Sequence, residues 1–361
     1  MIYKNEQINS KTFKEEVYKS INDYFKENHF SKHANHQMYI KLLIGFTWWI
    51  LSFILLFTVS TTKLGFFGLY TFHLFSQLFI LLNISHDANH NSIFKNKKLN
   101  HWLSYTFDLC GVNSYMWREL HHAQHHYCIN ISGEDENLVA RGLFRFTKKA
   151  KFKFFHKFQH IYFFILYGLF SADYVLAKDF ECFFLPYTIY LKEKKHPIME
   201  YIKLFLFKFC YIGYMILLPV FYLHYSFVFI IGIFFICHFM IGIIGGTVIQ
   251  ITHPLRANEF PESKKEYDNF VFHVFATTSD YSEKSTIANW FFGGLHLHVI
   301  HHLSPAICHT HYAVLTERIK LVAEKHKVQY KSNRTLFAAV KEHYYHLKNL
   351  SKNNIKVKYS E

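Results

Sequence analysis

Four long apolar windows of this sequence contain no Asp or Glu and very few Lys or Arg. The 361 residues nevertheless carry a formal net charge of +14. Glycine and proline are scarce, at 14 and 6 residues, whereas 51% of the residues are hydrophobic and 20% are aromatic. A soluble domain is normally less aromatic and mixes charged with apolar residues throughout. A lipid bilayer imposes the separation seen here. The composition therefore excludes an ordinary soluble protein and predicts an integral membrane protein.

Closely spaced cysteines are also missing. The six cysteines are scattered, form no CxxC motif and lack the short spacing of a disulfide scaffold, which is consistent with a reducing compartment. The first twenty residues lack the apolar core of a cleaved signal peptide, so we expect internal segments to direct insertion. Lys and Arg flank the apolar windows and no nucleic-acid-binding motif occurs, so the positive charge indicates anionic membrane lipid as partner and no nucleic acid.

The four apolar windows predict four transmembrane helices arranged as two hairpins. A helix of about 20 residues, rising 1.5 Å per residue, crosses roughly 30 Å of hydrocarbon. The connections within each pair are very short, so each pair is antiparallel. The windows are residues 42–62, 64–85, 202–223 and 226–252. A fifth apolar segment, residues 158–172, has only 15 residues before Asp173, and we expect it to lie in the membrane interface.

The distribution of Lys and Arg predicts the orientation in the membrane. The two short hairpin loops contain a single basic residue, Lys63. Nearly all other Lys and Arg residues lie in segments that the positive-inside rule places in the cytoplasm. We expect one all-α, multi-pass domain, residues 1–361, with its active site on the cytoplasmic face, as in a bacterial inner membrane. Its parts are an N-terminal arm (1–41), a first hairpin (42–85), a cytosolic segment (86–200), a second hairpin (201–252) and a cytosolic helical cap (253–361).

Histidine is in excess, with 27 residues, and its grouping is informative. Three clusters occur, HDANH (86–90), HHAQHH (121–126) and HLHVIHH (296–302), and His253 follows the fourth window. Side chains four apart share one face of an α-helix, so His86 and His90 can reach one metal ion. Four membrane crossings place all these elements on one side of the bilayer. A crossing by residues 158–172 would instead separate the second cluster from the third.

Nine or so imidazoles exceed the needs of one ion, which predicts a site for two. Neutral imidazole suits iron, zinc, copper and nickel, and an oxidising function beside a membrane favours iron because zinc has no redox chemistry. The alternatives are a pH-responsive basic surface or a metal-storage tract. Regular spacing at four separated positions disfavours both. We expect the isolated His73, His224 and His238 to be structural. Nearby carboxylates can orient imidazoles or remain solvated charges, and these are Asp87, Glu134, Asp135 and Glu136.

The segments HDANH, SYMWRELHHAQHHYCINISGEDENL and NWFFGGLHLHVIHHLSPAICHTHY resemble the three histidine boxes HxxxH, HxxxHH and QxxHH of membrane fatty-acid desaturases. The resemblance extends from about residue 30 to about residue 345. Within the family, the chain most resembles bacterial acyl-lipid desaturases and linoleoyl-CoA-desaturase-like members. It implies a four-helix membrane stem, a cytosolic cap that holds two iron ions, and removal of two hydrogens from an acyl chain with O2 as co-substrate. The ligands it implies are His86, His90, His121, His125, His126, His253, His298, His301 and His302.

The sequence departs from the family pattern in the third box and before His253, and the second box offers a choice between neighbouring histidines. The third box begins with His298 where many relatives have Gln, and His296 replaces the usual Asn. His122 competes with His121, although the spacing from Trp117 favours His121. Gln250 is the candidate for a water-bridging Asn that some relatives place one turn before the His253 position. The resemblance adds no separate catalytic acid or base, and it does not name substrate-binding residues.

The resemblance also implies partners. The substrate is a fatty acyl chain, as acyl-CoA or acyl-lipid, and the absence of an HPGG-like haem motif predicts a separate electron donor, a ferredoxin or a cytochrome b5 with its reductase. A hydroxylase or ketolase on the same scaffold is the nearest alternative function. A metal-ion transporter is an alternative of another class, which the lack of Asp and Glu in the four windows disfavours.

Overall fold

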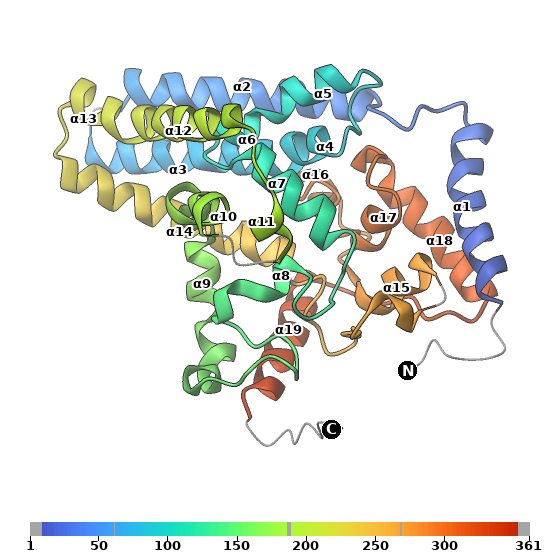
Figure 1. The fold of residues 1–361 in the computed structure, drawn as a ribbon. Coiled ribbons are helices and arrows are strands. Elements are labelled where there is room, and N and C mark those ends of the chain that lie inside the picture. Colours follow the sequence, from blue (N-terminus) through green and yellow to red (C-terminus); the bar gives the residue numbers. More distant parts are fainter. Residues whose placement is uncertain (1–8, 61, 186–188, 268, 353–361) are drawn as a thin grey trace.

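The computed structural model describes residues 9–60, 62–185, 189–267 and 269–352, and these fold almost entirely into helices (Figure 1). Two strands of two residues each, β1 (Asp280–Tyr281) and β2 (Ser332–Asn333), form a short parallel pair. The chain is therefore an all-α membrane protein in its described part, as the composition predicted.

Long apolar helices occupy the four predicted windows. The first hairpin contains α2 (His36–Thr58) and α3 (Lys63–Ile80), the latter continued by the π-helical turn η1 (Leu81–Ser85) and by α4 (His86–Asn89). The second contains α12 (Ile198–Ile212), the π-helical turn η6 (Gly213–Leu217), α13 (Leu218–Leu223) and α14 (Phe227–Gln250). Side-chain caps start three of these helices, since Asn35, Thr62 and Ser226 each accept a hydrogen bond from a first-turn amide.

A fifth helical run meets the length and composition needed for a membrane span, which the sequence analysis did not expect. The helix does not end at Asp173, because η4 (Phe154–Phe158), α9 (Gln159–Asp173), η5 (Tyr174–Lys178) and α10 (Asp179–Phe184) join into 31 continuous residues. The expected length of 15 residues was therefore wrong. A π turn carries the helix through Asp173, whose carboxylate is paired with Arg141 at 2.6 Å.

Helices α9 and α14 cross at very close range. A Cβ added to Gly242 of α14 would lie 2.3 Å from the carbonyl oxygen of Gly168 of α9. Glycine at both positions therefore allows the two backbones to touch, as small residues do between membrane helices. In Figure 1, α9 (green) runs across the direction of α2, α3 and α12, which lie along one another.

A chain of hydrogen bonds also ties the membrane helices together. Its members lie on α2, α3, α12, α14 and α9, and all but the half-buried Ser171 are buried. Their order is Ser52, His73, Gln77, Tyr211, His238 and Ser171. Successive contacts measure 2.8–3.1 Å, so the ring nitrogens of both histidines have partners inside the bundle. His73 and His238 therefore connect membrane helices, which is the structural role expected from the sequence.

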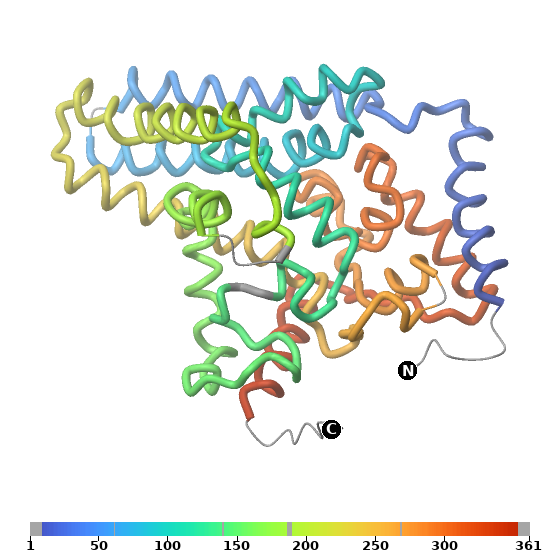
Figure 2. Tube along the Cα trace, in the orientation of Figure 1, coloured from blue at the N-terminus to red at the C-terminus, as the bar shows by residue number. Residues whose placement is uncertain are grey.

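The remaining elements build a cap with its own apolar core at one end of the bundle (Figure 2). Buried side chains of α1, α15, α17 and α18 form that core, including Phe13, Phe275, Ile300 and Leu315. The elements are α1 (Ser10–Glu27), α5 (Lys97–Ser104), α6 (Thr106–Leu109), α7 (Ser114–Leu120), η2 (His121–His125), α8 (Glu136–Val139), η3 (Ala140–Gly142), α11 (Ile189–Glu193), η7 (Lys264–Glu266), α15 (Phe270–Thr277), α16 (Thr286–Phe291), α17 (His298–Leu303), η8 (His309–His311), α18 (Tyr312–Lys325) and α19 (Leu336–Leu350).

Candidate metal centre

Eight buried or half-buried histidines converge where the membrane bundle meets the cap. The first histidine group consists of His86, His90, His121 and His301, and the second consists of His125, His253, His298 and His302. Within each group the candidate ligand nitrogens all lie within 4.8 Å of one another. Residues from four separated stretches of sequence thus meet in two adjacent sets.

Irregular helical turns position these side chains. The π turn η1 immediately precedes His86, and the second cluster is itself the π turn η2. In η2 the amide of His126 donates to the carbonyl of His121 at 2.8 Å, five residues earlier. This wider turn aligns His126 with His121 and sends His125 to the other group. Regular α-helical spacing would put His121 and His125 on one face, whereas in this turn they belong to different groups. π turns of this kind are common at functional sites.

His126 lies beside the first group, although it is not among its four members. Its Nε2 is 3.0 Å from Nε2 of His121 and 3.0 Å from Nε2 of His301. Its ring centroid is also 4.5 Å from that of His302 in the second group. His126 therefore occupies the boundary between the two groups.

The nitrogen atoms fit metal ions better than they fit one another. Nε2 of His86, of His90 and of His298 is buried and has no hydrogen-bond partner among the described residues. Leaving a buried polar atom unpaired costs about 1–3 kcal/mol, so several together indicate a missing ligand. Nε2 of His253 lies 3.1 Å from Nε2 of His302. Two nitrogens on neighbouring positions of one ion, each bound at about 2.1 Å, lie about 3 Å apart.

In three of the histidines, Nδ1 contacts a carboxylate or a carbonyl oxygen of the protein. Nδ1 of His125 lies 3.1 Å from the Asp135 carboxylate, and Nδ1 of His298 lies 3.0 Å from the Leu295 carbonyl. Nδ1 of His253 lies 3.4 Å from the carbonyl of Thr277. Acceptors at Nδ1 fix the tautomer that leaves Nε2 free to bind a metal ion. Asp135, marked by sequence as a possible orienting carboxylate, occupies such a position.

Burial keeps seven of the site imidazoles neutral. Desolvation, and then the charge of neighbouring imidazoles, holds the pKa of seven of these histidines well below the ordinary value, namely His90, His121, His126, His253, His298, His301 and His302. A neutral ring is the form that binds metal ions. The donor set of the site, imidazole without thiolate, is therefore ready for metal near neutral pH.

Three lower-ranked candidates lie outside both groups. His122 packs its ring 4.5 Å from that of His90, and burial lowers its pKa to about 4. His296 is fully buried between Tyr281 and Phe292, and burial lowers its pKa to about 3. Gln250 at the end of α14 lines a cavity instead.

That cavity reaches both histidine groups. His86 and His121 of the first group and His125 and His298 of the second form part of its wall, and the rest is mainly apolar, including Leu78, Leu82, Phe107, Val112, Ile241 and Leu295. A second cavity shares Glu136, Asn137, Phe170 and Gln250 with it and is bordered by Arg141, Asp173 and Lys178. Sequence patterns gave no signal for the apolar wall residues, because they come from helices far apart in the chain.

A glycine pair brings the third cluster against the first hairpin. Gly293 has φ of +57°, and a Cβ there would lie 1.9 Å from the carbonyl oxygen of Leu82 in η1. Only glycine fits such a contact. The turn that leads to His298 can therefore press directly onto the turn that leads to His86.

The sequence of the chain is similar to those of known proteins. The family model for fatty acid desaturases matches residues 60–334. The chain is 30% identical to a sn-1 linoleoyl-lipid 6-desaturase of Synechocystis sp., over 94% of this chain and 96% of that protein. It is 26% identical to the enzyme of the same name from Arthrospira platensis (94% and 93%) and 27% identical to an acyl-lipid (8-3)-desaturase of Physcomitrium patens (92% and 70%). No solved structure matches the chain significantly.

Proposed function

Because this chain belongs to the fatty acid desaturase family, we propose that it introduces a C=C bond into the acyl chain of a membrane lipid with O2 and two iron ions. The overall reaction converts –CH2–CH2–, O2, two electrons and two protons into –CH=CH– and two water molecules. The observation that carries the proposal is the pair of buried histidine groups beside one apolar cavity.

The proposed ligands are His86, His90, His121, His126 and His301 for one ion, and His125, His253, His298 and His302 for the other. The grouping of the ligand nitrogens within 4.8 Å and the two 3.0 Å contacts of His126 support this division. Two bound iron ions supply the activation of O2. His122, His296 and Gln250 are not proposed as ligands.

The chain's own residues bind and orient the substrate. An acyl chain in the apolar cavity would present its methylenes to rings of both groups, and the aliphatic and aromatic walls would exclude water. The second cavity gives a route in from α9, whose exposed Ile161, Ile165 and Leu169 suit contact with lipid. Arg141 and Lys178 at its border suit the polar end of a lipid.

We propose four membrane crossings, by α2, α3, α12 and α14, with α9 in the cytoplasmic interface. The ring of His125, which precedes α9, lies 4.7 Å from that of His253, which follows α14. An even number of crossings must therefore separate them, and α12 with α14 supplies two. The direction of α9 in Figure 1 also supports this topology.

The proposed partners are a separate electron donor, a ferredoxin or cytochrome b5 type with its reductase, and membrane lipid. The proposed location is the cytoplasmic face of a bacterial inner membrane. An excess of Lys and Arg in the arm, in residues 86–200 and in the C-terminal part supports both assignments.

Lipid analysis tests the reaction. The chain is expressed in a host supplied with defined acyl lipids, and the fatty acids are measured by mass spectrometry. A mass loss of two with about two iron ions per purified chain is expected. A gain of sixteen would identify a hydroxylase, and unchanged lipids with an active electron donor present would refute the proposal. His301→Ala is the matched inactive control.

A further inference from the structure

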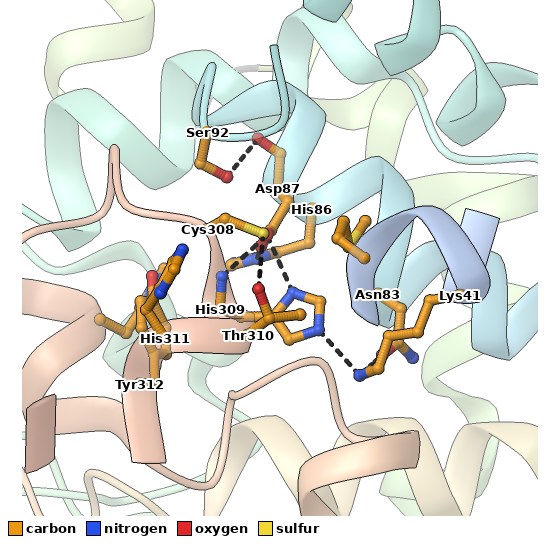
Figure 3. A network of polar contacts seen from close by, with 12 residues as sticks. Lys41, Asn83, His86, Asp87, Ser92, Cys308, His309, Thr310, His311 and Tyr312 are labelled. Atoms are coloured by element: carbon orange, nitrogen blue, oxygen red, sulfur yellow. Dashed lines mark hydrogen bonds and ion pairs between the residues drawn. The ribbon is translucent and has the colours of Figure 1, made fainter. Parts of the chain in front are cut away.

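A buried lysine is connected to the first histidine group through two side chains that the proposed metal site does not use. Lys41 of α2 is fully buried, and its Nζ lies 2.9 Å from Nε2 of His309 (Figure 3). Nδ1 of His309 lies 2.8 Å from Oδ2 of Asp87, and Oδ1 of Asp87 lies 3.6 Å from Nδ1 of His86. The order is therefore Lys41, His309, Asp87, His86.

The direction of each hydrogen bond follows from the donors. The Lys41 ammonium has three N–H groups, and it donates them to Asn83 Oδ1 at 2.8 Å, to the Asn289 carbonyl at 3.0 Å and to His309 Nε2. Nε2 of His309 is then an acceptor, so the ring is neutral and its Nδ1–H donates to Asp87. The His309 amide donates to the same carboxylate oxygen at 3.0 Å. Asp87 is thereby held from one side and faces His86 with the other oxygen.

This cluster is not a third metal site. Asp87, Cys308 and His309 lie close enough together to suggest one. Both ring nitrogens of His309 are, however, already engaged, by the lysine and by the carboxylate. The Lys41 ammonium on the other side of the His309 ring already places a positive charge near Asp87, which disfavours a further cation there.

The two histidine groups differ in how their carboxylates are held. Asp135, which contacts His125, accepts backbone amides of Asn130 at 2.8 Å and Asn137 at 3.0 Å. Asp87 accepts one backbone amide, that of His309, and also contacts the His309 ring, whose other nitrogen lies next to the buried Lys41 ammonium. A buried ion pair is weak evidence for stability, since burying charges is costly, and a specific function is the better reason to keep it. Carboxylates behind metal-binding histidines set ring orientation and metal affinity.

We propose that Lys41, His309 and Asp87 form a positioning relay that fixes the His86 ring and so sets the affinity of the first histidine group for its metal ion. Because Lys41 lies on the membrane helix α2, the relay also links the position of α2 to the geometry of one of the two metal ions. The inference rests on the proposed function in one respect, that the first histidine group binds metal.

Cobalt(II) binding to the metal-free, detergent-purified full chain tests the relay without any need for activity. Wild type is expected to bind two ions per chain by absorbance titration. Lys41→Met is expected to weaken one of the two by about 10- to 100-fold and leave the other unchanged. Lys208→Met is the matched control, because Lys208 is another buried lysine of a membrane helix paired with an aspartate, Asp179, at 2.6 Å. It is expected to keep both ions.

Each outcome of this titration either supports or overturns the relay. If Lys41→Met binds both cobalt ions with wild-type affinity, the relay is overturned. It is also overturned if the affinities for both ions fall equally, because that result means general damage to the site. If Lys41→Met fails to fold, as judged by gel filtration and circular dichroism, Asp87→Asn is measured by the same criterion. A wild-type chain that binds no cobalt would refute the metal centre of the proposed function itself, which separates the two failures.

Discussion

At the scale of single residues, the site depends on which nitrogen of each imidazole is occupied. His125, His253 and His298 each turn Nδ1 toward a carboxylate or carbonyl. The opposite nitrogen then points into the site. A neutral ring with one anchored nitrogen is a preorganised ligand, so little conformational entropy is lost when an ion binds.

Two neighbouring histidines should differ sharply in importance. His126→Ala removes a nitrogen that lies 3.0 Å from both His121 and His301, so we expect about one iron ion per chain and at least about 100-fold lower activity. His122→Ala removes a ring outside both groups, and activity should stay within about threefold of wild type. Iron content and product yield, measured together, check both; equal losses would contradict the ligand division.

Buried histidines outside the site should make the cap sensitive to acid. Burial lowers the pKa of His343 to about 3 and that of His346 to about 4, below the ordinary 6.5. The unfolded chain then takes up protons first as pH falls, so stability is constant above about pH 6.5 and declines below it. Each such group contributes about 1.4 kcal/mol of loss per pH unit. Thermal unfolding in detergent at pH 7.5 and 5.5 should show a smaller acid loss for His346→Gln than for wild type.

At the scale of elements, π turns and glycine contacts set the register of the site. The π turn η2 divides one histidine cluster between two groups, and η1 carries the α3 helix into His86. Gly293 lets the approach to α17 touch η1, and Gly168 and Gly242 let α9 touch α14. These local departures from regular helices bring together stretches that are far apart in sequence.

Gly293→Ala should disrupt the site rather than only strain the backbone. The new Cβ would meet the Leu82 carbonyl at 1.9 Å, so η1 and the third cluster must separate. Gly133→Ala is the control, because φ there is +88° but no atom lies within 4 Å of the added Cβ. We expect Gly133→Ala to lose about 1–2 kcal/mol and keep its iron. Gly293→Ala should lose iron as well; retention of two ions would contradict the contact.

A side chain added inside the apolar cavity should shorten the acyl chain that fits. Gly245 of α14 lines the cavity, and an added Cβ would lie 3.2 Å from Leu78, a contact that small shifts relieve. Gly245→Val is therefore expected to fold and to prefer shorter acyl chains in a competition among defined lipids. Gly232→Val on the same helix has nothing within 4 Å of its Cβ and should keep the wild-type profile. Identical profiles for the two variants would place the substrate elsewhere.

At the scale of the whole molecule, the site joins the membrane bundle to the cap. Ligand candidates come from the end of the first hairpin, from the segment before α9, from the end of α14 and from α17. The cap has a separate apolar core formed by α1, α15, α17 and α18. At that junction the proposed reaction would have the apolar bundle on one side and the proposed soluble electron donor on the other.

Chemical labelling should confirm four crossings. Single cysteines replacing Lys63 and Tyr225 are expected to react with a membrane-impermeant maleimide in spheroplasts. Cysteines replacing Lys98, Lys192 and Lys325 should react only after the membrane is opened, because their segments are proposed to be cytoplasmic. Labelling of Lys192→Cys in intact spheroplasts would instead mean that α9 crosses the bilayer.

The sequence by itself determined the membrane class, the long apolar helices and the histidines, because charge-free windows and clustered imidazoles are local features of the chain. It also indicated Asp87 and Asp135 as possible partners of those imidazoles. Only the tertiary structure decided the division of ligands, since a π turn is not visible in residue spacing and regular α-helical geometry places His125 with His121. The cavity wall and the Lys41–His309–Asp87 contacts likewise join residues up to 268 positions apart. Such contacts arise when apolar helices pack around buried polar groups that each need a partner, and that requirement is met only in three dimensions.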